Sequence, residues 1–445
     1  MIVDIPKNTV TNAATCIVKK LRESGFEAWF VGGAVRDVLL GKTPKDVDVA
    51  TSARPEELRH LFEHIREVGA SFGVMLIKQD ELWFEVATFR EERNYLDGRR
   101  PAEVKYTGDP RIDVIRRDFT VNGLLCDPFN GEVIDYTDGV NDLRKGILRT
   151  IGEPEVRFNE DYLRILRAVR FAARLGFEIE ASTAKAMRRM APKVAELAIE
   201  RVREELTLML VGYAPSRAMR MMTELGILDY ILPEVAKMKG ITQPPEYHPE
   251  GDVFEHTMLM LDHMALPSPE LAWSIILHDV GKPGTYFKEP DGRERFFKHE
   301  HLGADMSELI LKRLKAPNVL IETVSNAVRN HMRFAAAMQM KTAKLKKMMA
   351  DPYFSIELEL HRIDCISSHG ILDIYNFLLD KLVENEGITE LPSPLIGGRD
   401  LIELGMKPGP DFKLILDKAR DAQLSDEITC HEGAVEYVKS HFLNK

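Results

Sequence analysis

The apolar pattern of this chain changes near residue 146, and that change limits the folds open to it. Before residue 146, short apolar segments alternate with turn-rich links, which predicts strands at 28–31, 46–51, 73–78 and 82–89. After it, apolar residues recur every three or four positions, which predicts amphipathic helices almost throughout. We therefore expect an α+β protein in which a mixed part precedes a long helical part.

Two stretches rich in proline and glycine, 238–252 and 386–400, indicate further boundaries. A chain of 445 residues is also longer than one hydrophobic core usually supports. We expect four domains, at 1–145, 146–240, 241–370 and 371–445.

The composition is typical of a soluble globular protein, with 44% apolar and 29% charged residues. No apolar run approaches the ~20 residues that a membrane helix needs. The first residues lack the pattern of a secretory signal, and the four cysteines are scattered without a CxxC pair. These features predict a cytoplasmic protein without a membrane partner.

The net charge of −10 argues against a protein that coats nucleic acid indiscriminately. Between Arg144 and Arg174, however, eight basic residues oppose four acidic ones. This local excess predicts a surface that faces phosphate, and a solvated helix face is the alternative.

A glycine pair follows the first predicted strand. Gly32 and Gly33 have no Cβ atom, so the backbone can turn tightly there and approach a ligand. Residues 34–40 fit a short helix whose N-terminus would favour an anion, and Arg36 would add a phosphate contact. Taken alone, the pair also fits an ordinary structural turn.

Two aspartates stand at alternate positions of the next predicted strand. Asp46 and Asp48 would project from one face, roughly 6.6 Å apart, while Val47 and Val49 face the core. Like charges so placed repel each other unless a cation lies between them, and Mg²⁺ suits carboxylates that share it with substrate phosphates. The alternative is an exposed strand face with two solvated aspartates.

These residues lie in a segment that resembles a known family. The stretch GGAVRDVLLGKTPKDVDVAT (32–51) resembles the first motif of class II tRNA nucleotidyltransferases and bacterial poly(A) polymerases, which belong to the polymerase-β-like superfamily. Four further motifs follow in the family's order: RRDFTVNGL (116–124), DPFNGEVIDYTDGVNDL (127–143), NEDYLRILRAVRFAARLGF (159–177) and IERVREEL (199–206).

The resemblance implies a polymerase-β-like nucleotidyltransferase head, an elongated all-α neck, a body and a tail. In the first motif, Asp46 and Asp48 would be the catalytic residues and would hold Mg²⁺. The triphosphate would bind at Gly32, Gly33 and Arg36.

The resemblance also implies a ribose site in the second motif. Asp118 would accept a hydrogen bond from the ribose 2′-hydroxyl, and Arg117 and Asn122 would belong to the nucleotide site. Arg116 and Arg117 also fit a structural arginine–aspartate network. Glu85 would be a third carboxylate, or it would simply pair with an arginine.

In the fourth motif, the resemblance assigns Asp161 and Arg164 to the Watson–Crick edge of the incoming base. If the segment is helical, these residues three apart lie side by side around the axis. An ordinary intrahelical salt bridge is the alternative. Arg167 and Arg170 would continue the basic stripe toward phosphate.

Two segments bear on the product of such an enzyme. The charged segment 89–104 resembles the flexible loop of CCA- and A-adding members, which supports the change to ATP. The segment 68–76 lacks the arginines that bacterial poly(A) polymerases usually carry there.

A second constellation lies in the predicted body. It resembles the site of HD-domain phosphohydrolases and predicts a second divalent-metal site, or else a degenerate scaffold. Its residues are His256, His278, Asp279, His299, His331 and Asp364. His299 is preferred over His301 because the family pattern places the histidine four residues before Gly303.

The sequence thus predicts a Mg²⁺-dependent tRNA nucleotidyltransferase that adds CMP and AMP, from CTP and ATP, to the tRNA 3′ end, with no DNA partner. The nearest alternative is an A-only enzyme, either A-adding or a poly(A) polymerase. More distant alternatives are an HD-type RNA-end phosphohydrolase and a non-catalytic RNA-binding protein.

Overall fold

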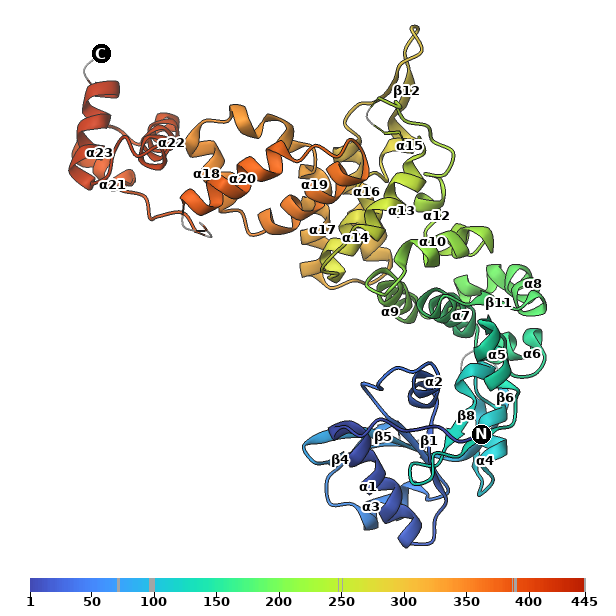
Figure 1. Ribbon diagram of the computed structural model, residues 1–445. Helices are drawn as coiled ribbons and strands as arrows, with labels where there is room; N and C mark the ends of the chain where they lie inside the picture. Colours follow the sequence, from blue (N-terminus) through green and yellow to red (C-terminus); the bar gives the residue numbers. More distant parts are fainter. Residues whose placement is uncertain are drawn as a thin grey trace. The chain divides into compact units, whose positions relative to one another are not determined.

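The structure, a computed structural model, describes residues 1–69, 73–95, 101–246, 248–249, 251–385, 387 and 390–443 (Figure 1). It divides into two compact units, Met1–Ala236 and Lys237–Lys445. The break lies close to the boundary expected after residue 240, and the four-domain division stays a prediction.

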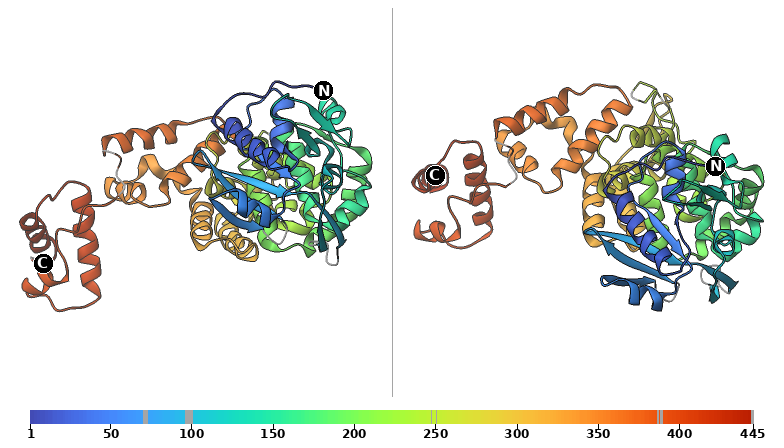
Figure 2. Two further views of the ribbon diagram at one scale, coloured as in Figure 1. Left: turned by 90° about the horizontal axis from the view of Figure 1, so that it is seen from below. Right: turned by 60° about the horizontal axis from the view of Figure 1, so that its bottom comes forward.

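The first unit is built on a mixed sheet of seven strands in the order β3-β4-β5-β2-β1-β8-β9. Strands β2 and β5 run parallel, and the other neighbouring pairs are antiparallel. Helix α1 (Thr9–Glu23) packs across β1, β2, β4 and β5 and covers one face (Figures 1 and 2). The strands are β1 (Ala28–Val31), β2 (Asp48–Thr51), β3 (Ile65–Gly69), β4 (Val74–Gln79), β5 (Leu82–Thr88), β8 (Leu124–Cys126) and β9 (Val133–Asp135).

The glycine pair connects β1 to helix α2 (Gly33–Leu39), as the sequence predicts. Gly32 has a φ of +66°, a left-handed conformation that costs little only for glycine. The sharp turn exposes the start of α2 next to the end of β1.

The rest of the first unit is mostly helical. Helix α7 packs against α9 and α10, and the parallel pair β10 (Ile147–Leu148) and β11 (Glu178–Ile179) joins the two ends of the segment that contains α6 and α7. The helices are α3 (Pro55–Leu61), α4 (Pro110–Ile115), η2 (Thr120–Asn122), α5 (Gly139–Lys145), α6 (Pro154–Glu160), α7 (Leu163–Leu175), α8 (Ala181–Met190), η3 (Ala191–Glu196), α9 (Ile199–Leu210), α10 (Pro215–Glu224), α11 (Leu228–Ile231) and α12 (Pro233–Ala236).

Among its described residues, the second unit forms helices and one hairpin, β12 (Tyr286–Lys288) and β13 (Glu294–Phe296). Separate apolar clusters form around Phe334 and Phe354 and around Leu401 and Ile415. Its helices are α13 (Val253–Asp262), α14 (Pro269–Leu277), α15 (Lys282–Thr285), α16 (His299–Arg313), α17 (Asn318–Asn330), η4 (Arg333–Gln339), α18 (Thr342–Met349), α19 (Phe354–Ser367), α20 (Asp373–Glu384), α21 (Gly398–Glu403), α22 (Pro410–Leu424), α23 (His431–Val438) and η5 (Lys439–Leu443). None of the helices described is long and apolar enough to span a bilayer.

Two local predictions need correction. Strand β2 begins at Asp48 rather than at Asp46, although Val47 and Val49 are buried as expected. Much of the predicted loop 89–104 forms an antiparallel ribbon of β6 (Arg90–Tyr95) and β7 (Pro101–Tyr106). Cross-strand pairing gives charged residues a β conformation that local periodicity does not reveal. Positions 96–100 of that loop, and positions 70–72 of the segment 68–76, lie outside the described residues.

Gly139 tests how α5 is docked in this unit. A Cβ atom added at Gly139 would lie 2.1 Å from the carbonyl oxygen of Thr120. Thr120 stands in the sequence between Asp118 and Asn122, two residues of the predicted site. We expect Gly139→Ala to lower the free energy of unfolding by about 1–3 kcal/mol, because the backbone has to move apart. Gly108→Ala is the control, since nothing lies within 4 Å of its added Cβ. Denaturant unfolding measures both variants, and equal stability would contradict the packing described.

Candidate active site

One cleft of about 580 Å³ in the first unit gathers all the predicted site residues of the head and neck. Arginines outnumber carboxylates in its lining, so the cleft attracts anions. The predicted residues that line it are Gly32, Gly33, Arg36, Asp46, Asp48, Arg117, Asp118, Asn122, Asp161, Arg164, Arg167 and Arg170.

The carboxylates of the cleft come from two adjacent strands. Asp48 begins β2, and Glu85 lies on β5, its parallel neighbour, where Val49 pairs with Val86. Burial raises the pKa of Asp48 to about 6, and repulsion from Glu85 and Asp46 adds to the rise. No ion pair is recorded for Glu85 within the described ranges, so it acts here as a third negative group rather than as an arginine partner.

Arg36 is almost fully buried beneath the glycine turn. Its guanidinium donates to the side-chain oxygen of Asn122 at 2.7 Å and to Asp37 at 2.8 Å. It also lies over the ring of Phe171, with 5.6 Å between the guanidinium carbon and the ring centre. These contacts fix its charge at one place below the start of α2.

Arg116 and Arg117 both bind Asp113, a buried residue that the sequence analysis did not single out. Arg116 lies 2.6 Å from one carboxylate oxygen and Arg117 3.0 Å from the other. Burial alone would raise the pKa of Asp113, but the two guanidinium groups outweigh it and the pKa is lowered. The arginine–aspartate network considered as an alternative is therefore present, and it holds Arg117 against the cleft beside Gly32.

Asp118 is held by α7. One carboxylate oxygen accepts from Arg167 at 2.7 Å, and the other accepts from the side chain of Asn122 at 3.2 Å. Burial would raise the pKa of Asp118, but Arg167 outweighs it, so the pKa is lowered and the group stays ionised. It therefore remains a hydrogen-bond acceptor in the wall of the cleft.

Arg164 lies in helix α7, but the continuous helix considered for the pair does not extend to Asp161. Helix α6 ends at Glu160 and α7 begins at Leu163, so Asp161 has an extended backbone between two helices. Its carboxylate instead accepts from the backbone N–H of Leu163 at 3.0 Å, which secures the start of α7. This local hydrogen bond competes with a continuous helix, and periodicity alone does not detect it.

Two further side chains hold Asp161 and Arg164. Arg201 of α9 lies 3.0 Å from the Asp161 carboxylate, and Glu160 binds Arg164 in an ion pair. Arg164 also donates to the backbone carbonyl of Arg116 at 3.0 Å. Arg201 was missed because it lies forty positions away, and only its presence in the fifth motif could have drawn attention to it.

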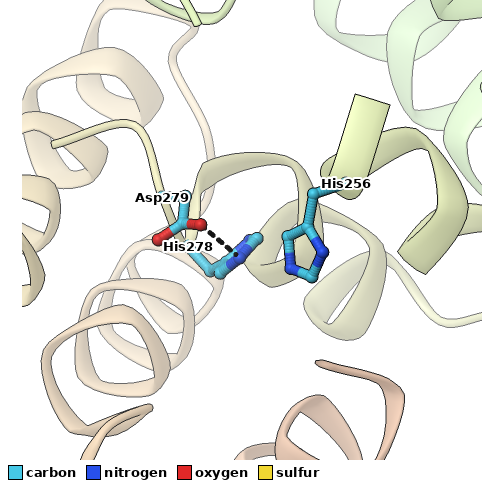
Figure 3. A group of neighbouring side chains, drawn as sticks. All are labelled: His256, His278 and Asp279. Atoms are coloured by element: carbon cyan, nitrogen blue, oxygen red, sulfur yellow. Dashed lines mark ion pairs between the residues drawn. The ribbon is translucent and has the colours of Figure 1, made fainter. Parts of the chain in front are cut away.

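The six residues predicted in the body also meet, at a buried cluster in the second unit. Their ligand atoms form two groups that share Asp279: His256 with His278, and His299 with His331. In each group the atoms lie within 4.8 Å of one another. Figure 3 shows the first group, in which Nε2 of His278 lies 3.1 Å from Asp279. Asp364 joins through His256, at 3.1 Å.

Backbone carbonyls orient three of these histidines. Nδ1 of His278, His299 and His331 each lies 2.7–2.9 Å from a carbonyl oxygen three residues earlier. A carbonyl can only accept, so Nδ1 carries a proton in each ring, and Nε2, on the side of Asp279, is the atom that would ligate a metal ion. Burial lowers the pKa of His331 to about 3, so this ring is neutral near pH 7, as a metal ligand must be.

The cluster fits a divalent metal ion. Nε2 of His278 and both carboxylate oxygens of Asp279 are buried and make no hydrogen bond of regular geometry to any described residue. Lys282 and the neighbouring imidazoles lie within ion-pair distance instead. Imidazole and carboxylate donors around such buried acceptors suit a transition metal.

Three family models match the chain. A poly(A) polymerase head domain matches residues 28–149, the "probable RNA and SrmB-binding site of polymerase A" matches 176–239, and an HD domain matches 252–356. A CCA-adding enzyme of Leuconostoc mesenteroides is 43% identical over 96% of both chains. One of Ligilactobacillus salivarius is 32% identical over 90% of this chain and 89% of the other. This chain belongs to the CCA-adding enzyme family.

The fold agrees with solved members of that family. A crystal structure of the Bacillus stearothermophilus CCA-adding enzyme in complex with CTP covers 99% of this chain and all of its own, with a TM-score of 0.77 and 25% identity. The predicted α+β class, the nucleotidyltransferase head and the HD domain are confirmed by these matches, and the chain is a nucleotidyltransferase. A nucleotidyltransferase head and an HD domain both indicate the use of divalent metal ions.

The ligand groups of the HD cluster predict which histidine substitution lowers metal binding. We expect His299→Ala to lower the metal bound per chain after loading with Mn²⁺, because the ring is a member of one ligand group. His301→Ala is the matched control, since its side chain is 54% exposed and outside both groups. Metal analysis of the dialysed proteins makes the comparison, and equal loss in both variants would exclude the proposed ligand set.

Proposed function

We propose that this chain adds CMP and AMP, from CTP and ATP, to the 3′ end of tRNA and releases pyrophosphate. The observation that supports this proposal most directly is that all residues predicted for nucleotide transfer line one arginine-rich cleft. The same cleft contains the carboxylates of Asp46, Asp48 and Glu85. The relatives are named CCA-adding enzymes, and the solved structures of such enzymes include complexes with CTP, with ATP and with tRNA.

In the proposed reaction, the 3′-hydroxyl oxygen of the RNA bonds to the α-phosphorus of the nucleotide. The bond from that phosphorus to the β-phosphate oxygen breaks, pyrophosphate leaves and the hydroxyl proton is lost. Gly32, Gly33 and Arg36 would bind the triphosphate, because a sharp turn and a buried guanidinium present positive potential at the start of α2. Arg117 would add positive charge beside Gly32.

Mg²⁺ is the ion that best fits the head. Asp46, Asp48 and Glu85 offer only carboxylate oxygens, and within the described residues only the HD groups have three ligand atoms within 4.8 Å of one another. A looser set of hard ligands suits an ion that completes its shell with substrate phosphates and water. When bound, Mg²⁺ would neutralise triphosphate charge and favour ionisation of the attacking hydroxyl.

Base selection is proposed for Asp161 and Arg164. A carboxylate acceptor and a guanidinium donor recognise complementary positions on a base edge, and a mismatched base would leave buried groups unpaired at about 1–3 kcal/mol each. Arg201 and Glu160 would act as positioning residues, because each holds one member of the pair. Asp118, ionised beside Arg167, would accept from the ribose hydroxyl.

The HD cluster supports a second, separate activity. Metal ions at such sites activate water for attack on phosphoesters. We therefore propose metal-dependent phosphoester hydrolysis in the body. Asp279→Asn would remove this hydrolysis and leave nucleotide addition intact, and Asp48→Ala would do the reverse.

The test of the main proposal uses three tRNA transcripts, ending at the discriminator base, at C and at CC. Each receives CTP, ATP or both, and the products are resolved at single-nucleotide length. We expect three-nucleotide extension of the first transcript with both nucleotides, and none with Asp48→Ala. Addition of AMP to the CC transcript alone would replace this proposal with an A-adding enzyme, and long A tails with a poly(A) polymerase.

Proton and metal ion should compete for Asp48. Its pKa of about 6 exceeds the ordinary 3.8, so the carboxyl is protonated below about pH 6 and ionised above it. The apparent dissociation constant for Mg²⁺ should therefore be level above pH 6 and rise about tenfold per pH unit below it. Nucleotide addition at several Mg²⁺ concentrations measures this. The acid limb should move to lower pH as Mg²⁺ increases, and a limb that stays fixed would contradict competition at this site.

A further inference from the structure

A second hollow of about 260 Å³ lies beside the nucleotide cleft in the first unit. It is formed by the end of α7, the end of α9 and the segment 211–214 that leads into α10. We call it the neck slot. Arg170 and Arg174 line both the slot and the cleft, so the two hollows are continuous along one face of α7.

Arg170 and Arg174, which line both hollows, differ in how firmly their side chains are held. Arg170 lies 2.6 Å from the buried Glu205 and packs over the ring of Phe171, at 4.5 Å from the guanidinium carbon to the ring centre. Arg174, about one helical turn further on, is exposed, and no ion pair is recorded for it in the described ranges. A fixed cation and a free one therefore stand at the passage from cleft to slot, which suits a chain of phosphates.

The rest of the slot is apolar and open to solvent. Leu208 is 51% exposed and Tyr213 is 89% exposed, although both line a hollow. Met209 adds a further apolar wall. An exposed aromatic ring next to arginines is the combination on which single-stranded nucleic acids stack their bases.

The backbone holds Tyr213 in place over the slot. A Cβ atom at the preceding Gly212 would lie 2.8 Å from the carbonyl oxygen of Leu208 and 3.2 Å from that of Met209. The chain therefore turns closely over the last turn of α9, which a larger residue would prevent. Tyr213 is exposed because of this turn and not because it sits on a long free loop.

We infer that the neck slot binds the base of the nucleotide at the 3′ end of the RNA acceptor, while the incoming nucleotide lies in the cleft. The inference rests on the proposed function, since it places the acceptor next to the nucleotide it receives. Tyr213 and Leu208 would stack on the base, and Arg174 would contact its phosphate. Arg167, which lines the cleft but not the slot, and Arg174, which lines both, are about 10 Å apart along the helix axis, so the two sites are adjacent.

The first experiment measures stacking without catalysis. A tRNA acceptor stem with 2-aminopurine as its terminal base is titrated with the full-length protein, and fluorescence quenching is recorded without nucleotide. We expect quenching with the unaltered protein and with Tyr213→Phe, which keeps the ring, and its loss with Tyr213→Ala. Tyr230→Ala is the control, because Tyr230 is 48% exposed and does not line the slot.

The second experiment separates the two substrates. With the transcript that ends at CC and with ATP, Tyr213→Ala should raise the KM for RNA about tenfold or more and leave the KM for ATP unchanged. Thermal unfolding checks that the variant is folded. An unchanged KM for RNA would overturn the inference, and a raised KM for ATP alone would assign the slot to the nucleotide instead.

The two proposals fail in different ways. If the unaltered protein extends no transcript, the proposed function fails, whatever the fluorescence shows. If it adds CCA but Tyr213→Ala quenches 2-aminopurine normally, only the neck slot inference fails.

Discussion

Pairing between arginine and carboxylate is the interaction on which the cleft depends. Arg36, Arg116, Arg117, Arg167 and Arg170 are each held by an acidic side chain of the protein. Free guanidinium groups would have to be ordered when substrate arrives, at the cost of side-chain entropy. Because the pairs are made in advance, the positive potential of the cleft has a fixed shape, and charge that develops during phosphoryl transfer meets donors already in position.

The sequence predicts the members of the site better than their local structure. The glycine turn and the aspartates at 46 and 48 can be found because their chemistry depends on short spacings within one segment, and the HD residues because their order along the chain resembles that of a known family. Arg201 escapes notice, since its partner Asp161 lies forty positions away and only the fold brings the two together. Asp113 pairs with Arg116 and Arg117 three and four positions later, but it stands just before the second motif and belongs to none of the quoted motifs. The break at Asp161 is missed for another reason. The Asp161 side chain accepts a hydrogen bond from the backbone N–H of Leu163 and interrupts the helical pattern, and apolar periodicity does not reveal such a bond.

The head and the body prepare their metal sites in opposite ways. In the head, burial and the repulsion of neighbouring carboxylates raise the pKa of Asp48, so the site without a metal ion holds a proton more readily than an ordinary aspartate does. In the body, burial keeps His331 neutral, and backbone carbonyls fix the rings so that their Nε2 atoms already face Asp279. The first arrangement favours exchangeable ions that come with substrate, whereas the second favours an ion that stays.

The short parallel pair β10–β11 has a consequence for how this chain can vary. It pairs Ile147 with Glu178, so the chain enters and leaves the segment that carries Asp161 and Arg164 at neighbouring points. Because the two ends of this segment meet, its interior can be lengthened, shortened or replaced without displacing the parts of the chain before and after it. Its packing against α8, α9 and α10 must be preserved, and so must the hydrogen bonds from Arg164 and Arg167 to the head. Nucleotide preference could therefore be transplanted between homologues as one uninterrupted stretch of about thirty residues, with the catalytic carboxylates left untouched.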